Sequence, residues 1–393
     1  MVQTLDENIG IIGIEHEFPE FRYSTEELFD ILGNKLSEKV KDNIRQLGVE
    51  HRHFVRPIEY YLQNSESTIP SSDNHKEPIS DLSAQAAKKC LSSFDLKPEN
   101  ISCLIAASEN NDYLSPGLSS ILLRKIGLSN FTPHFNLQGM ACSTFPKVLE
   151  LGKNLVHNDS DNVLIVISGC NSGWYLPHLK DNMFIRNPKE IGENQYDRDL
   201  QIQKWVSTMF SFLFGDGAVA LVLSKNKNNN RIVRLRKFAH AVNFDQFDYR
   251  KACVQLKPQY SNHLYEHELT AGHRVIDMAV DYSKKVLMNF LGKDYNSFDE
   301  NEAKSFMKEF EKVMIHTGSL KILDRFKSLY GLRDDQIQES YDTLREYGNL
   351  TGCSIPTVMN KAFLKSNSNT AKGLLVGITM GFGLDIVEVE RTT

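Results

Sequence analysis

A cysteine at the start of a predicted apolar helix is the residue best placed for chemistry. Cys142 precedes Val148, Leu151 and Leu155, which recur at helical spacing, and Pro146 fits only a first helical turn. The segment before Cys142 is predicted to be a strand. The positive field at a helix N-terminus favours a thiolate and lowers the pKa of a cysteine. Cys142 is therefore a candidate nucleophile; the alternative is a small buried core cysteine.

Polar and glycine-rich segments in the second half of the chain could complement such a thiol. His316 ends the apolar strand predicted over 313–316, where ligands of open α/β sheets collect. Asn349 lies beside a glycine, just before a predicted helix. Gly381 and Gly383 belong to a turn in which a backbone N–H can approach a ligand closely. The alternatives are a histidine bonded to backbone, a turn or N-cap asparagine, and a plain hairpin turn.

Strand and helix signals alternate along the chain, which predicts an α/β protein with largely parallel strands. The segments 65–78 and 175–206 are predicted to be loops. Strands are predicted over 9–14, 101–107, 131–137, 162–168, 313–316, 373–379 and 384–390, and the segment 210–223 is predicted to hold a tight glycine turn and an apolar strand. Helices are predicted over 26–49, 80–92, 118–128, 272–291, 320–330 and 355–364, and a further helix is opened by Cys142.

The chain divides into two halves of similar style. A polar break at 226–230 separates residues 1–225 from residues 226–393. The segment around Cys142 has an echo in the second half, Gly-Cys353-Ser-Ile-Pro, apart from one residue of spacing. This echo favours an ancient duplication and makes Cys353 a rival nucleophile.

Composition restricts the classes of function. The chain has 393 residues, 41% hydrophobic and 24% charged, with a net charge of -5, which argues against a nucleic-acid partner. The six cysteines have no zinc-like spacing, so no metal site is expected. In a chain of this size they are expected to be reduced thiols. The first residues lack the pattern of a signal peptide, and no apolar run is as long as a membrane span. A cytoplasmic protein without a membrane partner is therefore expected.

Five motifs, in order, resemble those of condensing enzymes of the thiolase superfamily. The resemblance covers essentially the whole chain and is nearest to type III polyketide synthases of the chalcone synthase kind and to ketoacyl synthase III. The motifs are Gly-Met-Ala-Cys142, Leu-Phe-Gly-Asp216-Gly-Ala, His316-Thr-Gly-Ser, Tyr-Gly-Asn349 and Gly-Phe382-Gly.

This resemblance implies a five-layered αβαβα fold of two pseudo-symmetric halves, usually in a homodimer. It implies a Cys-His-Asn triad, here Cys142, His316 and Asn349. Cys142 takes an acyl group from coenzyme A or a carrier protein, and His316 and Asn349 stabilise the enolate formed by decarboxylation of a malonyl unit. Cys142 and the turn Gly381–Gly383 supply the oxyanion hole, and His316 holds Cys142 as a thiolate. No cofactor beyond the acyl-CoA and malonyl-CoA substrates is implied.

The chain departs from each relative in places. His316 is followed by threonine where chalcone-type enzymes have proline, and Leu384 stands where their Gly-Phe-Gly turn is followed by proline. The run Ser354-Ile-Pro is more similar to ketoacyl synthase III. These mixtures leave the acyl substrate and its carrier open.

Basic residues near the N-terminus are candidates for binding the nucleotide of coenzyme A. Lys39, Lys41 and Arg45 occupy a helix comparable to the one that grips nucleotide phosphates in plant enzymes, although their pattern differs; the alternative is a solvated helix face. Arg52 resembles part of a Gly-Ile-x-x-Arg element of ketoacyl synthase III near its CoA entrance.

Three functions remain open at this point. The first is decarboxylative Claisen condensation through an acyl-Cys142 intermediate. The second is an acyltransferase on the same fold, which passes the acyl group to an alcohol or amine. The third is a noncatalytic partner subunit, which loss of a triad residue would have favoured; all three triad residues are present.

Overall fold

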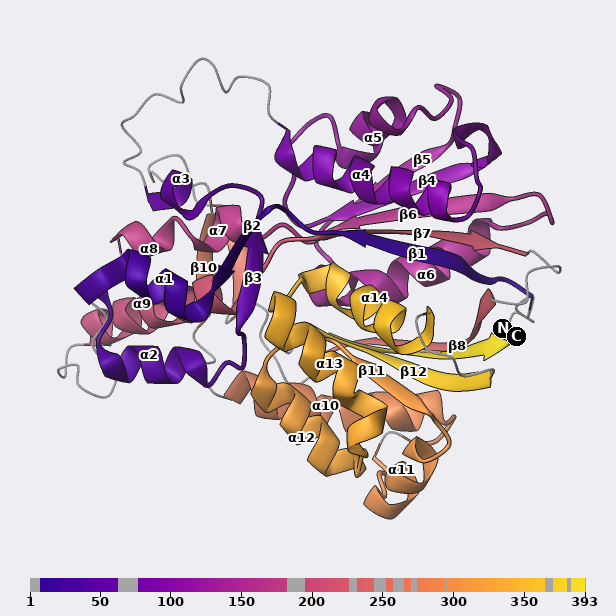
Figure 1. Ribbon diagram of the computed structural model, residues 1–393. Coiled ribbons are helices and arrows are strands. Elements are labelled where there is room, and N and C mark those ends of the chain that lie inside the picture. Colours follow the sequence, from indigo (N-terminus) through magenta and orange to yellow (C-terminus); the bar gives the residue numbers. More distant parts are fainter. Residues whose placement is uncertain are drawn as a thin grey trace.

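A mixed nine-stranded sheet organises the fold (Figure 1). The computed structural model describes residues 8–62, 77–181, 195–225, 232–243, 252–256, 265–269, 274–294, 296–364, 370–379 and 383–392. The strand order is β11-β12-β13-β8-β1-β7-β6-β4-β5. The strands are β1 (Gly10–Glu17), β4 (Cys103–Ser108), β5 (His134–Leu137), β6 (Asn162–Ser168), β7 (Ala218–Ser224), β8 (Ile232–Val242), β11 (Lys312–Ile315), β12 (Thr370–Thr379) and β13 (Gly383–Thr392).

Strand direction differs from the expectation of a largely parallel sheet. The strand β4 pairs in parallel with β5 and β6, and β11 pairs in parallel with β12. The other ladders of the sheet are antiparallel, including β1 with β7 and β13 with β8. The prediction was wrong because apolar runs also form in antiparallel strands that helices cover on both faces.

The elements stack in five layers, as the resemblance implies. Helices α4 and α5 cover one face of β4, β6 and β7. Helices α6 and α14 fill the space between those strands and β12 and β13. Helices α10 and α12 cover the outer face of β11–β13. Figure 1 shows this order from α4 and α5 at the top to α10 and α12 at the bottom.

Most of the helices predicted from the sequence are present in the structure. The helix α12 and the strand β6 have the predicted bounds, and α5 ends at Gly127, whose φ of 85° needs the left-handed region that glycine enters freely. The helices are α1 (Thr25–Leu32), α2 (Glu38–Arg45), α3 (Ile58–Leu62), α4 (Pro78–Ser93), α5 (Leu118–Ile126), α6 (Thr144–Leu155), α7 (Ser172–Tyr175), α8 (His178–Asp181), α9 (Gln195–Leu213), α10 (Arg274–Phe290), α11 (Glu300–Met307), α12 (Leu320–Tyr330), α13 (Asp334–Tyr347) and α14 (Ser354–Met359).

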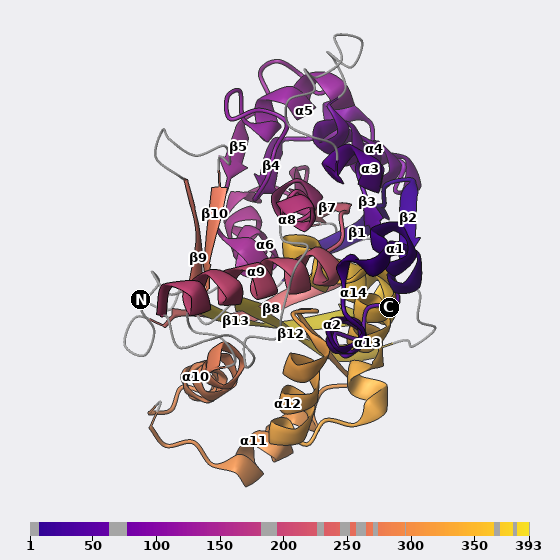
Figure 2. The same cartoon turned by 90° about the vertical axis from the view of Figure 1, so that its left-hand side faces the viewer.

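Several helical segments differ from the prediction. The segment 26–49 forms two helices, because Gly33 at φ 59° ends α1 and the Ser37 side chain caps α2 by accepting the N–H of Val40. The helix α9 (Figure 2) occupies part of the predicted loop 175–206, of which residues 182–194 lie outside the described part. The helices α11 and α13 were not predicted.

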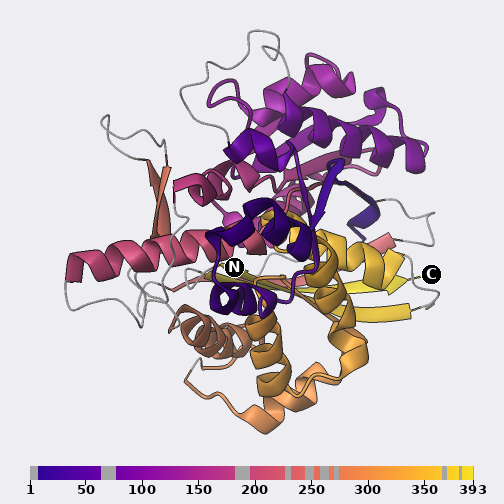
Figure 3. The same ribbon diagram turned by 60° about the vertical axis from the view of Figure 1, so that its left-hand side comes forward.

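Two small antiparallel sheets lie beside the main sheet. The strand β2 (Phe21–Ser24) pairs with β3 (His51–Phe54), and β9 (Ala252–Leu256) pairs with β10 (Tyr265–Leu269). Figure 3 shows β9 and β10 standing near one end of α9. The predicted division at residue 225 falls between β7 and β8 and remains a prediction.

Among the described residues, no helix combines the length and the apolar character that crossing a membrane requires.

Candidate active site

Cys142 lies in a tight turn directly before the central helix α6. The turn is the 3-10 helix Ala141–Ser143, and Ala141 adopts a positive φ of 44°, which is unusual for a residue with a side chain. The Cys142 side chain is buried at 5% exposure. The Ser143 hydroxyl forms a hydrogen bond with the Thr379 hydroxyl at the end of β12. The second half of the chain thus holds the turn that carries the thiol.

Asn349 reaches Cys142 from the second half of the chain. The backbone of Asn349 donates to Leu213 O at 2.8 Å and accepts from the N–H of Gly215 at 3.1 Å, which fixes the loop. Its side-chain oxygen accepts the N–H of Thr351 at 2.8 Å. The amide NH2 group is therefore free to face the thiol, and a side-chain hydrogen bond from Asn349 acts to lower the pKa of Cys142. The structure brings these two predicted site residues together.

His316 follows the last residue of β11 and is fully enclosed. Its backbone N–H donates to Val376 O at 2.9 Å. Within the part of the chain that the structure describes, neither of its buried ring nitrogens has a hydrogen-bond partner. Burial lowers the pKa of His316 to about 3, because the charged imidazolium is poorly solvated there. The ring is neutral in this state, and the ion pair expected with Cys142 is not formed.

The loops that carry His316 and Asn349 are fastened to each other. The hydroxyl of Thr317 contacts Gly348 O at 3.2 Å and the Ser354 hydroxyl at 2.8 Å. The Ser354 oxygen in turn accepts the N–H of Leu350 at 3.0 Å. These bonds flank Asn349 on both sides. The threonine that replaces the proline of chalcone-type enzymes therefore connects the loops that carry the predicted site residues His316 and Asn349.

The turns around Cys142 and Asn349 approach each other very closely. A Cβ atom at Gly352 would lie 2.8 Å from Cβ of Thr144, and one at Gly169 would lie 2.1 Å from Leu350 O. Real Cβ atoms do not approach that closely, so both positions need glycine. The absence of these side chains allows the two halves to meet at the site.

The thiol of Cys142 is not stabilised as a thiolate in this structure, contrary to the expectation from the helix field. Burial raises its pKa, and the nearby carboxylate of Glu109 raises it further. Glu109 follows β4 and accepts the backbone N–H groups of Met140 at 3.0 Å and Ala141 at 2.5 Å. The negative carboxylate thus offsets the positive field at the start of α6.

Two residues at this site were missed by the sequence argument. Glu109 follows a buried strand at its carboxyl end, which is the signal that identified His316, so it could have been found. Tyr175 on α7 is buried, burial raises its pKa, and the acidic groups of Cys142 and Glu109 act in the same direction. Its ring stacks on Phe214 at 4.6 Å between centroids. Tyr175 lay in a predicted loop and carried no such signal.

The glycine turn near the C-terminus is only partly described. Gly381 and Phe382 lie outside the described residues. Gly383 begins β13, and a Cβ atom built there would lie 4.0 Å from the Ser143 hydroxyl. Its position beside the Cys142 turn is compatible with the predicted oxyanion hole, which stays a prediction.

The Gly-Asp216-Gly motif has a structural role. Asp216 is fully buried and accepts the N–H groups of Val55 at 2.9 Å, Asn171 at 2.7 Å and Ser172 at 2.9 Å. Burial raises its pKa to about 6, although these bonds act in the opposite direction. One carboxylate thereby joins the segments after β3, β6 and α9 behind the site.

The predicted coenzyme A residues lie apart from the thiol. On α2, Arg45 pairs with Glu26 at 2.9 Å and with Asp42 at 2.8 Å, and Lys41 pairs with Glu38 at 2.8 Å. A bound phosphate would have to compete with these carboxylates. Lys39, on the same helix, is exposed.

Arg52 lies inside the protein instead of at a surface entrance. Its side chain is fully buried, and one terminal nitrogen donates to the Thr25 hydroxyl at 2.7 Å. Burial lowers the pKa of Arg52 to about 9. In this arrangement the guanidinium cannot contact a nucleotide in solvent.

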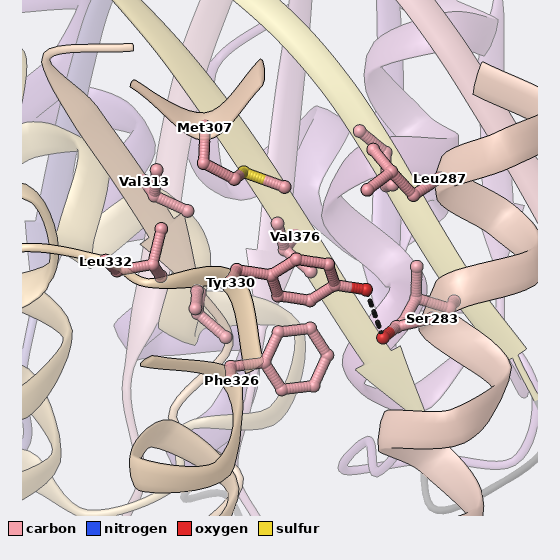
Figure 4. Close-up of a pocket in the computed structure, with 11 residues that line it drawn as sticks. Ser283, Leu287, Met307, Val313, Phe326, Tyr330, Leu332 and Val376 are labelled. Atoms are coloured by element: carbon pink, nitrogen blue, oxygen red, sulfur yellow. Dashed lines mark hydrogen bonds between the residues drawn. The ribbon is translucent and has the colours of Figure 1, made fainter. Parts of the chain in front are cut away.

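A cavity in the described part of the chain lies on the outer face of the sheet (Figure 4). It is mostly apolar, and its polar contact is a hydrogen bond of 2.6 Å between Ser283 and Tyr330. Ile315 and Val376 line it, whereas their strand neighbours pack toward α6 and α14. The sheet therefore separates this cavity from Cys142.

The fold and the site resemble those of thiolase-like condensing enzymes, and the comparisons with known proteins agree with this resemblance. No family model matches the chain. A β-ketoacyl-[acyl-carrier-protein] synthase III of Campylobacter jejuni is 25% identical over 292 residues, 74% of this chain and 75% of that protein. A phloroglucinol synthase of Pseudomonas fluorescens is 22% identical over 383 residues, 95% of this chain and 97% of that protein.

Solved structures show the same fold. The 1,3,6,8-tetrahydroxynaphthalene synthase of Streptomyces coelicolor, a bacterial type III polyketide synthase, matches with a TM-score of 0.75 and 18% identity over 98% of this chain and 99% of that chain. A mutant of OleA from Xanthomonas campestris matches with a TM-score of 0.69 and 18% identity, over 98% of each chain. The predicted resemblance to condensing enzymes, the thiolase-like fold and the assignment as an acyl-transferring enzyme are confirmed.

Proposed function

We propose that this protein joins an acyl thioester to a malonyl thioester by decarboxylative Claisen condensation, with Cys142 as the acyl carrier. The observation that carries the proposal is the meeting of Cys142 and Asn349 from the two parts of the chain. The loop of Asn349 is bonded through Thr317 to that of His316, whose buried ring nitrogens have no hydrogen-bond partner among the described residues. The sequence relatives named above are condensing enzymes, which supports the reaction class.

The first step loads the acyl group. The proton of the Cys142 thiol moves to a ring nitrogen of neutral His316, and the thiolate attacks the carbonyl carbon of the acyl thioester. The leaving thiolate takes that proton as the tetrahedral intermediate collapses. A histidine with a low pKa is a weak base, so the proton is held only while the thioester is attacked.

The second step forms the carbon nucleophile and the new bond. The amide NH2 of Asn349 and an N–H of neutral His316 donate to the carbonyl oxygen of the malonyl thioester. Loss of CO2 leaves an enolate that these donors stabilise. The enolate carbon attacks the acyl-Cys142 carbonyl, a carbon–carbon bond forms, and the bond from the carbonyl carbon to the Cys142 sulfur breaks. Cys142 leaves as a thiolate, which takes up a proton from solvent.

The substrates under this proposal are acyl-CoA and malonyl-CoA, or the corresponding carrier-protein thioesters, in the cytoplasm, with no further cofactor. Lys39 and the paired Lys41 and Arg45 on α2 are the surface candidates for the nucleotide phosphates.

A homodimer fits the surface at one edge of the sheet. The strand β5 pairs with β4 and is the last strand of the sheet, with no partner on its other side among the described residues. Phe131, three residues before β5, is 93% exposed, Phe135 of β5 is also exposed, and Leu114, between β4 and α5, is 89% exposed. An open edge with exposed apolar side chains is suited to a second copy of the chain. We expect light scattering to give roughly 90 kDa, twice the 44.8 kDa of one chain; a monomer at micromolar concentration contradicts this.

Release of CO2 from malonyl-CoA tests the reaction class directly. The wild-type protein should release CO2, and Cys142→Gln should still release it while failing to capture a radiolabelled acyl group, because decarboxylation needs only the two neutral donors. If the wild-type protein captures acyl groups but releases CO2 from neither malonyl-CoA nor a malonyl carrier protein, transfer of the acyl group to an alcohol or amine becomes the better account.

A further inference from the structure

Glu109 accepts several hydrogen bonds from the turn that precedes Cys142. One carboxylate oxygen accepts the N–H groups of Met140 and Ala141, and the other accepts that of Gly139 at 3.1 Å. The backbone oxygen of Glu109 accepts from the Gln138 side chain at 3.1 Å. Four consecutive residues before Cys142 are therefore anchored on one glutamate.

This anchoring holds a backbone that would otherwise be unfavourable. Gly139 has a φ of 81° and Ala141 has a φ of 44°. A non-glycine residue with positive φ costs about 1–3 kcal/mol and persists only where its surroundings determine the conformation. The three N–H bonds to Glu109 supply that determination.

The charge of Glu109 acts on the thiol as well. Burial raises the pKa of Glu109, and the three N–H bonds, which stabilise the ionised carboxylate, act in the opposite direction. The other titratable groups beside Cys142 are neutral at pH 7: burial raises the pKa of Tyr175 and lowers that of His316 to about 3. Among the described residues, Glu109 is thus the acidic group that acts on Cys142, and in its ionised form it raises the pKa of the thiol.

We propose that Glu109 is a positioning residue with two effects: it shapes the nucleophile turn, and it keeps Cys142 a thiol until an acyl donor binds. The resting enzyme then has no free thiolate, and deprotonation occurs only with His316 as base during acyl transfer. The inference rests on the proposed role of Cys142. Its test needs no acyl donor, so its failure is distinct from failure of the proposed condensation.

Alkylation of Cys142 by iodoacetamide between pH 6 and 10, quantified by peptide mass, separates the effect of charge from that of shape. Glu109→Gln keeps the shape of the side chain and removes the charge, so the inflection of rate against pH should move about 1–3 units toward acid. At pH 7 the rate should rise about threefold per unit, because the weaker basicity of the thiolate offsets part of its greater abundance. Glu99→Gln, at an exposed position, removes the same charge elsewhere and should leave the inflection unchanged.

Glu109→Asp supplies the converse test. It keeps the charge but shortens the reach to the turn by one methylene, so acyl loading should slow by about tenfold or more through misplacement of the thiol, without an acid shift of the inflection. An unchanged inflection in Glu109→Gln, or the same shift in Glu99→Gln, overturns the proposal. If Glu109→Gln does not fold, the wild-type protein decides: thiolate absorbance near 240 nm at pH 7, measured against Cys142→Ala, overturns it, and absence of that signal supports it.

Discussion

The turns that carry Cys142 and Cys353 have similar backbones but different surroundings. Each is a 3-10 turn followed by an α-helix with proline in its first turn, α6 after Cys142 and α14 after Cys353. Each contains a non-glycine residue at positive φ, 44° at Ala141 and 50° at Thr351. The one-residue offset in the sequence echo persists, since Ala141 directly precedes its cysteine and Thr351 lies two residues before.

The partners of the two thiols differ. Cys353 is fully buried and its sulfur contacts Ile167 O at 3.3 Å and Gly217 O at 3.6 Å, so its S–H donates to carbonyl groups that repel a thiolate. Cys142 instead faces the amide of Asn349, a donor that favours the thiolate. Burial raises the pKa of both thiols. The two cysteines differ in the groups that they contact. Asn349 belongs to the segment just before Cys353, but its side chain contacts Cys142 in the first half of the chain.

The largest expected effect is the contrast between the two cysteine variants. Cys142→Ala removes the acyl acceptor and should reduce condensation by about 10⁴–10⁶-fold, the scale found when a covalent nucleophile is removed. Cys353→Ala removes a sulfur that only packs, and should lower the free energy of unfolding by about 1 kcal/mol with little change in rate. Steady-state product formation and thermal unfolding of both variants measure this.

The next effect isolates Asn349. Asn349→Ala should leave acyl loading measurable but reduce CO2 release from malonyl-CoA by about 10²–10³-fold, the cost of one oxyanion donor. The two half-reactions are followed in parallel with a radiolabelled acyl-CoA and a labelled malonyl-CoA. Decarboxylation at the wild-type rate in this variant would show that the amide does not serve the enolate.

A smaller effect is expected at the connection between the two catalytic loops. Thr317→Val removes the bonds to Gly348 and Ser354, which should reduce decarboxylation by about tenfold through displacement of His316 and Asn349. It also leaves buried acceptors unpaired, at about 1–3 kcal/mol of stability. Thr343→Val is the matched control, because the buried Thr343 hydroxyl has no partner, and it should change neither quantity appreciably. Equal losses of decarboxylation in the two variants would contradict the proposal that Thr317 positions the loops of His316 and Asn349.

Local patterns predicted the elements well where a single run of residues decides them. The run 162–168 is apolar throughout and forms β6, and 320–330 has its cap at Ser319 and its stop at Gly331. The segment 26–49 failed because Gly33 and Ser37 end one helix and begin another within an amphipathic run. Strand direction failed because it depends on pairing between distant segments.

The site was predicted in its residue types but not in its electrostatics. The motifs identified Cys142 and Asn349, which the structure brings together, and His316, which it leaves without the expected ion pair. The prediction of a lowered pKa for Cys142 considered only the positive field at the start of α6. It could not include Glu109, whose carboxylate reaches the turn from 31 and 32 residues earlier in the chain. Such through-space charge follows from the packing of β4 against the turn, which local periodicity does not report.

The most direct test is to locate the acyl group itself. The wild-type protein is incubated with a panel of acyl-CoAs, digested, and its cysteine peptides are weighed. The account predicts an acyl adduct on the Cys142 peptide and none on the Cys353 peptide, with no adduct in Cys142→Ala. An adduct on Cys353, or one that survives in Cys142→Ala, would contradict the assignment of Cys142 as the nucleophile.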